Sequence, residues 1–221
     1  MRFMLATGNR HKLGEFRKIL APLEVLPMPA WVELPPEDVE SFAGNARDKA
    51  LGLARALAAA GPRRSATPPI GSGPPDLLYL ADDSGLEVEA LGWAPGVTSA
   101  RYAGVDGPGA DVANVTRLLR EMAGCAGPRA RRARFVCSVV VVAPDLREYA
   151  ATGHWWGVIA TAPRGEGGFG YDPVFVPEGS DLTVAEWPQA DKDQASHRAL
   201  AGRALLERLR REGLLRSDQR P

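Results

Sequence analysis

Two carboxylates stand side by side at Asp82 and Asp83, directly after the apolar run 77–81 and before Ser84 and Gly85. If the apolar run is a strand, both acids lie at its carboxyl end, where α/β proteins place their ligands. A pair of carboxylates there suits Mg²⁺, a hard cation that takes few protein oxygens and keeps several waters. Asp, Ser and Gly are also ordinary turn residues, so a turn that ends the strand is the alternative.

A second stretch with chemistry is LATGNRHKLGEF, residues 5–16. A glycine-containing turn between a strand and a helix lets backbone N–H groups converge on an anion, and the helix dipole adds partial positive charge. Thr7, Asn9 and Lys12 add a hydroxyl, an amide and a full charge. The spacing is not that of a Walker loop. The stretch predicts a phosphate site, with a capped helix and a solvated lysine as the alternative.

Lysine is scarce in this chain. Only Lys12, Lys18, Lys49 and Lys192 are lysines among the 27 basic residues. A lysine is a compact point charge that can approach phosphate, whereas arginine is a broad planar fork. Each lysine is therefore a candidate for a specific role.

The glycine-rich stretch GEGGFGYDPVF (165–175) places Phe169 between two glycines. An aromatic ring on such a loop can stack on a nucleobase, because every base has a π face. The alternative is a hairpin turn with Phe169 in the core, but glycine on both sides makes a poor strand interior.

Lys192, His197 and Arg198 gather around the predicted start of the last helix, in DKDQASHRAL. A helix N-terminus favours anions. On these residues alone, a solvated charged loop with Ser196 as the capping residue explains the pattern better.

The elements that must position these residues follow from hydrophobic periodicity. Strands are expected at 2–6, 23–28, 77–81, 133–144 and 147–161, and helices at 10–20, 41–60, 111–124 and 196–213. Consecutive strands after residue 134 suggest hairpins, so the sheet is expected to be mixed. The Pro-, Gly- and Ser-rich tract 61–76 is expected to be a flexible surface loop within one α/β domain that spans 1–221.

Composition excludes several classes of protein. The formal net charge is zero, which disfavours a polymeric nucleic-acid partner. No run of 18 apolar residues is present, and the N-terminus reaches a turn too soon for a signal peptide, so no membrane contact and a cytoplasmic location are expected. Two cysteines are too few for a disulfide framework, and Cys137 is expected to be a buried small hydrophobe.

Seven blocks together resemble the inosine triphosphate pyrophosphatase family, enzymes that hydrolyse non-standard purine nucleoside triphosphates. In order, the blocks are ATGNRHKLGEF, SFAGNARDKA, ADDSGLEVEALGWAPGVTSARYAG, RARFVCSVV, GHWWGVI, GFGYDPVF and SHRAL. They span nearly the whole chain from Phe3 to the last helix, so the resemblance is specific.

The resemblance implies a two-lobed α/β fold with a mixed, elongated sheet, a deep substrate cleft between the lobes and a homodimer. It also implies Mg²⁺-dependent attack of water at the α-phosphorus of ITP, dITP or XTP, which gives the monophosphate and pyrophosphate.

In this sequence Asp83 would be the general base, and Asp83 and Glu37 would bind the metal. Ten further positions would contact the phosphates or nearby substrate groups, or complete the base site: Thr7, Gly8, Asn9, Arg10, His11, Lys12, Lys49, Ser84, His197 and Arg198. Phe169, Gly170, Tyr171, Asp172 and Lys192 would form the base pocket.

Two positions depart from the family pattern. Gly44 stands where the family usually has Glu before Asn, so one carboxylate is lost. The family's metal-binding Glu falls at Pro36 in strict register, and Glu37 is its neighbour. The alternatives are a Maf-like nucleotide pyrophosphatase, against which the TGN and SHR blocks argue, and a nucleotide-binding module without catalysis, which Gly44 alone supports.

Overall fold

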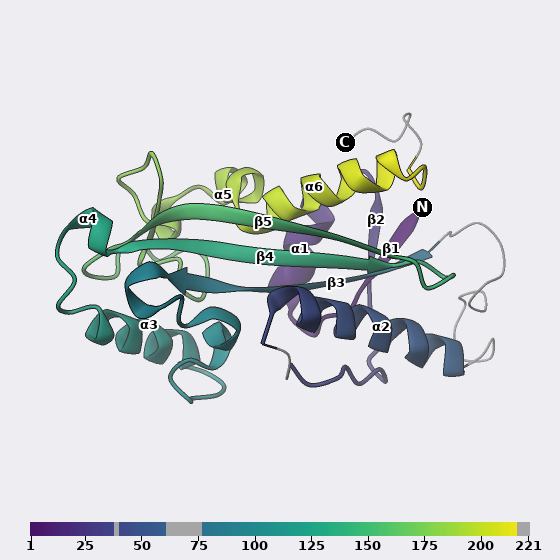
Figure 1. Ribbon diagram of the computed structural model, residues 1–221, viewed down its shortest axis with the longest axis horizontal. Coiled ribbons are helices and arrows are strands. Elements are labelled where there is room, and N and C mark those ends of the chain that lie inside the picture. Colours follow the sequence, from purple (N-terminus) through teal and green to yellow (C-terminus); the bar gives the residue numbers. More distant parts are fainter. Residues whose placement is uncertain (38–39, 61–76, 216–221) are drawn as a thin grey trace. The chain divides into compact units, whose positions relative to one another are not determined.

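The computed structural model describes residues 1–37, 40–60 and 77–215. Its centre is a six-stranded sheet in the order β2-β1-β3-β4-β5-β6 (Figure 1). The strands are β1 (Arg2–Leu5), β2 (Glu24–Pro27), β3 (Leu77–Val88), β4 (Arg132–Val142), β5 (Glu148–Ile159) and β6 (Phe175–Pro177). Strand β1 is parallel to β2 and β3, whereas β5 and β6 are antiparallel, which confirms the mixed sheet.

In the described ranges, six α-helices accompany the sheet. They are α1 (Arg10–Ile19), α2 (Phe42–Ala60), α3 (Ala110–Glu121), α4 (Gly127–Ala130), α5 (Gln189–Ala195) and α6 (His197–Arg211), with 3₁₀ turns at Glu89–Leu91, Gly96–Arg101 and Val184–Glu186. The four helices expected from periodicity are all present. The short helices α4 and α5 were not expected, because four and seven residues are too few to show a helical period.

Contacts along the chain divide it into two compact units. The first unit comprises 1–83, 137–153 and 198–221, and the second comprises 84–136 and 154–197. Strands β3, β4 and β5 contribute residues to both units. Two units agree with the two lobes that the resemblance implied, and the cleft between the lobes stays a prediction.

In the first unit, successive side chains of β1 and β3 pack into two different cores, one on each face of the sheet. Phe3 and Leu5 of β1 and Leu78 and Leu80 of β3 pack in one core with α1 and α6. Met4 belongs to a second core with α2, as do Leu77, Tyr79 and Ala81 of β3. Successive side chains of a strand point to opposite faces, so α1 and α6 cover one face and α2 covers the other (Figure 1).

In the second unit, aromatic rings fill much of the core. Phe135 packs on Phe175 and His197 at centroid distances of 4.6 and 4.7 Å, and Trp155 packs on Phe175 and Trp187 at 5.6 Å each. The buried guanidinium of Arg131 donates to the backbone carbonyls of Ile159, Ala160, Met122 and Cys125. It thereby fixes the start of β4 against the end of β5.

Strand β3 corrects the predicted strand boundary. The sequence placed its end at Ala81, whereas the strand continues through both aspartates to Val88. Asp82 and Asp83 therefore lie inside a strand. Residues 86–88 are the end of that strand, and a 3₁₀ turn follows at Glu89–Leu91. Cys137 is fully buried, as predicted. The tract 61–76 lies outside the described residues.

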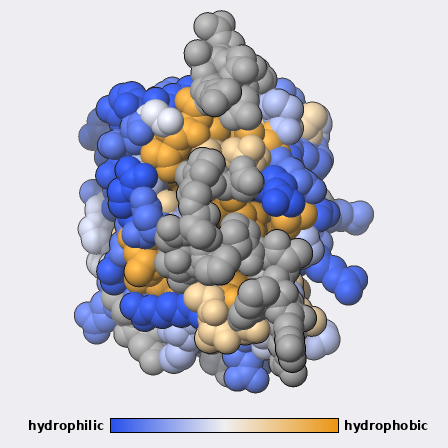
Figure 2. Space-filling model, turned by 90° about the vertical axis from the view of Figure 1, so that its right-hand side faces the viewer, coloured by the Kyte–Doolittle hydropathy of each residue, from blue (hydrophilic) through white to orange (hydrophobic). Residues whose placement is uncertain are grey.

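Some apolar side chains reach the surface. Figure 2 shows hydrophobic residues bordered by hydrophilic ones on one face of the molecule. Trp31 and Leu146 of the first unit and Trp93 and Val112 of the second are exposed. Scattered apolar exposure is ordinary for a folded protein. In the described part of the chain, no helix has the length and apolar content needed to cross a membrane.

Candidate active site

Asp82 points to the α1–α6 face of the sheet. It is in phase with Leu78 and Leu80, and its carboxylate Oδ2 lies 2.8 Å from Lys12 Nζ and 3.6 Å from Arg198 Nε. Burial would raise the pKa of Asp82, but the charges of Lys12, Arg198 and Lys49 outweigh burial and lower that pKa to about 2. Asp82 is therefore a buried, ionised acid that holds two cations in place.

Glu15 of α1 completes this group. Its Oε2 lies 3.0 Å from Arg198 Nη1, and both side chains are buried. Arg198 was predicted to help bind the base, but its guanidinium contacts Glu15 and Asp82 of its own unit. The guanidinium is thus held by two carboxylates from different elements, which fixes its orientation.

Asp83 points to the opposite face, toward α2. Its Oδ2 accepts a hydrogen bond from Asn45 Nδ2 at 3.0 Å, and its Oδ1 lies 3.3 Å from Lys49 Nζ. Lys49 Nζ also donates to Glu37 Oε1 at 2.8 Å. One ammonium group therefore links the two carboxylates that the resemblance assigned to the metal.

The ionisation of this group reflects its burial. Burial raises the pKa of Asp83, and the negative charge of Glu37 raises it further, against the opposing effects of Lys49 and Asn45. Burial would lower the pKa of Lys49, but Asp82, Asp83 and Glu37 raise it overall, so the ammonium stays charged. A carboxylate with a raised pKa is a better proton acceptor than an ordinary one.

Helix α2 positions the group. Asn45 and Lys49 are four residues apart, so they lie on one helical face, and both are buried against β3. The chain before Glu37 packs closely on the same helix: a Cβ atom at Gly52 would come within 2.7 Å of Pro35 Cδ. Gly52 therefore allows the close approach that brings Glu37 to Lys49.

Glu37 and Asp83 also fit a magnesium ion. Both offer hard oxygen donors, and Mg²⁺ is commonly held by one or two carboxylates together with water and substrate phosphates. Across the residues that the structure describes, no group of three or more His, Cys, Asp and Glu side chains is arranged to hold a metal ion.

The TGN loop forms a capped helix start. Asn9 Oδ1 accepts hydrogen bonds from the backbone N–H groups of His11 and Lys12 at 2.9 and 3.3 Å, and Thr7 Oγ1 accepts from Asn9 N at 3.1 Å. The backbone N–H of His11, a predicted phosphate-binding residue, donates to Asn9 Oδ1 in this structure. Gly8 and Arg10 are exposed on the same turn.

Asp172 organises the predicted base site in the second unit. Its Oδ2 accepts from Phe169 N at 2.8 Å and from Lys192 Nζ at 2.5 Å. Lys192 Nζ lies 4.4 Å from the centroid of the Phe169 ring, over its face. Gly168 has φ +74°, and a Cβ there would lie 2.0 Å from Asp172 Oδ2, so glycine is required at that position.

Tyr171 and His197, both predicted for the base site, are buried in the second unit. Tyr171 is buried and its hydroxyl donates to Ser99 O at 2.8 Å; burial raises the pKa of this hydroxyl. His197 is buried and stacks on Phe135 with an interplanar angle of 13°. Lys192 and His197 belong to the second unit and Arg198 to the first, and Ser84 is half-buried in β3.

Sequence reasoning gave no role to Asn45 or Glu15. Asn45 stands four residues before Lys49 and Glu15 three after Lys12, and these same-face helical spacings could have indicated both residues. Asp111, whose Oδ2 accepts from Gly170 N at 2.7 Å, gave no local signal, because its partner is 59 residues away.

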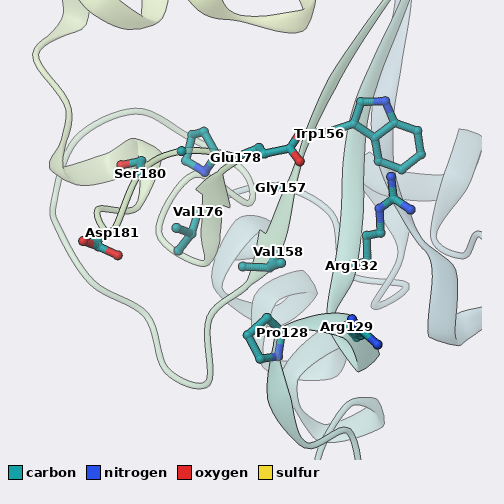
Figure 3. A pocket seen from close by; sticks show the side chains of 12 residues that line it. Pro128, Arg129, Arg132, Trp156, Gly157, Val158, Val176, Glu178, Ser180 and Asp181 are labelled. Atoms are coloured by element: carbon teal, nitrogen blue, oxygen red, sulfur yellow. The ribbon is translucent and has the colours of Figure 1, made fainter.

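A separate cavity of about 490 Å³ lies in the second unit (Figure 3). Arg129 and Arg132 line one side of it and Ser180 and Asp181 the other, with Val158 and Val176 between them. Its lining contains none of the residues predicted for substrate or metal. The cavity and the predicted base site are therefore different features of that unit.

Comparison with known proteins gives concordant matches. The sequence model of the Ham1 family matches residues 3–208. A dITP/XTP pyrophosphatase of Ralstonia nicotianae is 43% identical over 215 residues, which cover 95% of this chain and 96% of the relative. The Staphylococcus aureus Ham1 protein has a structure with a TM-score of 0.76 at 32% identity, covering 96% of this chain and 99% of that one. A Mycobacterium abscessus structure described as nucleoside-triphosphatase / dITP/XTP pyrophosphatase gives 0.69 at 37% identity, covering 94% and 98%.

Proposed function

This chain belongs to the Ham1 family, and we propose that it hydrolyses ITP, dITP and XTP to the monophosphate and pyrophosphate. Such an activity keeps non-standard purines out of DNA and RNA. The observation that carries the proposal is the group formed by the buried Asp83, Asn45 and Lys49 with the half-buried Glu37, which combines a raised-pKa carboxylate, a cation and a second carboxylate.

Lys12 and Lys49 supply the positive charge that a triphosphate requires. A nucleoside triphosphate carries about four negative charges, which must be neutralised before a nucleophile can approach. Each lysine is held by a carboxylate, Lys12 by Asp82 and Lys49 by Glu37 and Asp83. Fixed cations need little reorganisation when the substrate binds. Thr7 and Asn9 shape the turn from which Lys12 extends.

Asp83 is the proposed general base. Asn45 binds one of its oxygens and Lys49 approaches the other, so the carboxylate is fixed in one orientation. It accepts the proton of the attacking water as the water oxygen bonds to the α-phosphorus and the bond to the pyrophosphate oxygen breaks. Glu37 and Asp83 would hold Mg²⁺, which supplies charge neutralisation to the phosphates when bound. The Mg²⁺ requirement is part of this proposal.

The Phe169 loop is proposed to bind the purine. Phe169 is half-buried and offers a ring for stacking, and Asp172 fixes both its backbone and Lys192. Hypoxanthine and xanthine carry an acceptor oxygen at the 6-position, where adenine carries an amino donor. A lysine donor at this site favours the keto bases and leaves adenine's amino group unmatched. Tyr171 holds the loop through Ser99.

A homodimer is also proposed, on the resemblance alone, and the cytoplasmic location that the sequence led us to expect is proposed with it. The rival function, a nucleotide-binding module without catalysis, had Gly44 as its support. Gly44 lies in the first turn of α2, and its N–H donates to the Oγ of Ser41, the residue before the helix, at 3.1 Å. The contacts of Asp83 with Asn45 and Lys49, and of Lys49 with Glu37, form with Gly44 present, which supports an enzyme.

Pyrophosphate release tests the proposal. With Mg²⁺, the protein should release pyrophosphate from ITP, dITP and XTP much faster than from ATP, and EDTA should abolish the release. A Maf-like enzyme would act on other nucleotides instead. Binding of ITP without any pyrophosphate release in Mg²⁺ would contradict the proposed activity and support the non-catalytic module.

A further inference from the structure

The loop that carries Phe169 is held at three consecutive residues. Phe169 N donates to Asp172 inside the loop, Gly170 N donates to Asp111 Oδ2 at 2.7 Å, and the Tyr171 hydroxyl donates to Ser99 O at 2.8 Å. Two of the three anchors come from the segment 96–114, which is remote in sequence from the loop. That segment therefore acts as the support of the loop.

The support is itself rigidly built. The buried side chain of Asn114 accepts from Ala103 N at 2.7 Å and donates to Ala100 O at 3.0 Å. Ser99 Oγ accepts from Leu86 N at 2.9 Å. Asp111 lies in the first turn of α3, the helix that contains Asn114, so its carboxylate projects from a fixed element.

The backbone N–H of Gly170, at an exposed position, donates to an acceptor outside its own loop. Gly170 has φ +62°, in the left-handed region, so its backbone is not part of a regular helix or strand. The carboxylate of Asp111 receives this N–H, and a charged acceptor gives a stronger hydrogen bond than a neutral one. Removing the acceptor frees the backbone next to the Phe169 ring.

We propose that Asp111 is a positioning residue that fixes the Phe169 loop and so sets the affinity for the purine. The inference rests on the proposed role of Phe169 as the base-stacking ring. Asp111 acts through the loop and contacts no phosphate-binding side chain in the described structure. Its loss should weaken binding of every purine triphosphate, with little effect on the chemical step.

Kinetics of Asp111→Ala and Asp111→Asn test this. Asp111→Ala should raise the KM for ITP about threefold to tenfold, the range of one hydrogen bond, with kcat within about twofold. Asp111→Asn keeps an acceptor oxygen and should restore most of the affinity.

Inhibition by inorganic triphosphate, which has no base, should be unchanged in both variants. In a Phe169→Ala background, Asp111→Ala should add no further increase in KM. Asp106→Ala, an exposed aspartate just before α3, is the control.

Amide hydrogen exchange supplies a readout that does not depend on activity. The Gly170 amide should exchange faster in Asp111→Ala than in the wild type, and Asp111→Asn should restore its protection. Unchanged exchange, or an unchanged KM in an active protein, would overturn the proposal. If the wild type fails to hydrolyse ITP, the proposed function fails, and the exchange rate still decides whether Asp111 holds the loop.

Discussion

Asp82 and Asp83 are adjacent in β3, yet their carboxylates serve opposite faces of the sheet. Asp82 Oδ2 lies 2.8 Å from Lys12 of α1, whereas Asp83 Oδ1 lies 3.3 Å from Lys49 of α2. The two carboxylates lie on opposite faces because successive side chains of a strand point in opposite directions. Asp82 thereby orients cations of α1 and α6, and Asp83, on the other face, is the proposed general base.

Because Asp82 contacts cations and Asp83 is the proposed base, Asp82→Asn should mainly lower the free energy of unfolding. Asp82 is fully buried, and its loss leaves Lys12 and Arg198 without their shared carboxylate. Breaking a buried charge group in this way lowers the free energy of unfolding by about 3 kcal/mol. Urea denaturation measures this loss.

Asp145→Asn is the matched control. Asp145 pairs with Arg147 at the exposed surface, and such pairs contribute less than about 1 kcal/mol. An equal and small loss of stability in the two variants would show that the Asp82 group does not stabilise the fold.

Alanine substitutions at two glycines of the Phe169 loop should differ in their effects on stability and on the KM for ITP. Gly168 and Gly170 both have positive φ, so a side chain strains either by roughly 1–2 kcal/mol. Only at Gly168 would the new Cβ also collide with Asp172, at 2.0 Å. Gly168→Ala should therefore lower the free energy of unfolding and raise the KM for ITP clearly more than Gly170→Ala. Parallel urea titrations and ITP kinetics compare them, and equal effects would contradict the role given to Asp172.

Phe169→Ala should weaken substrate binding without unfolding the protein. The ring is half-buried, with Lys192 over its face, and base stacking contributes about 1–3 kcal/mol. The expected result is a higher KM for ITP and an unchanged melting temperature. A lower melting temperature with an unchanged KM would instead make Phe169 a core residue.

The sequence predicted the main elements because their periodicity is strong, but it placed the end of β3 too early. Asp, Ser and Gly are poor strand residues, so residues 82–85 resemble a turn. In the structure, partners from α1, α2 and α6 compensate the buried acids, and the strand continues. Such compensation is tertiary and leaves no local pattern.

The same reason limited the predicted site. The candidate lysines and acids could be found by residue type and by resemblance. The anchors of the base loop could not, because Asp111 and Gly170 are 59 residues apart and Ser99 and Tyr171 are 72 apart. The burial of Tyr171 and the pairing of Arg198 with Glu15 also depend on the folded chain.

The turnover of Asp83→Asn tests the central claim most directly. The substitution keeps the shape of the side chain and removes the charge that accepts the proton of water and contributes to the metal site. Because general-base action alone contributes about 10²–10⁴-fold, kcat for ITP in Mg²⁺ should fall at least about a hundredfold. The variant should still fold, which its urea midpoint checks. Near-normal turnover of Asp83→Asn in Mg²⁺ would contradict the mechanism, even if ITP proved to be the substrate.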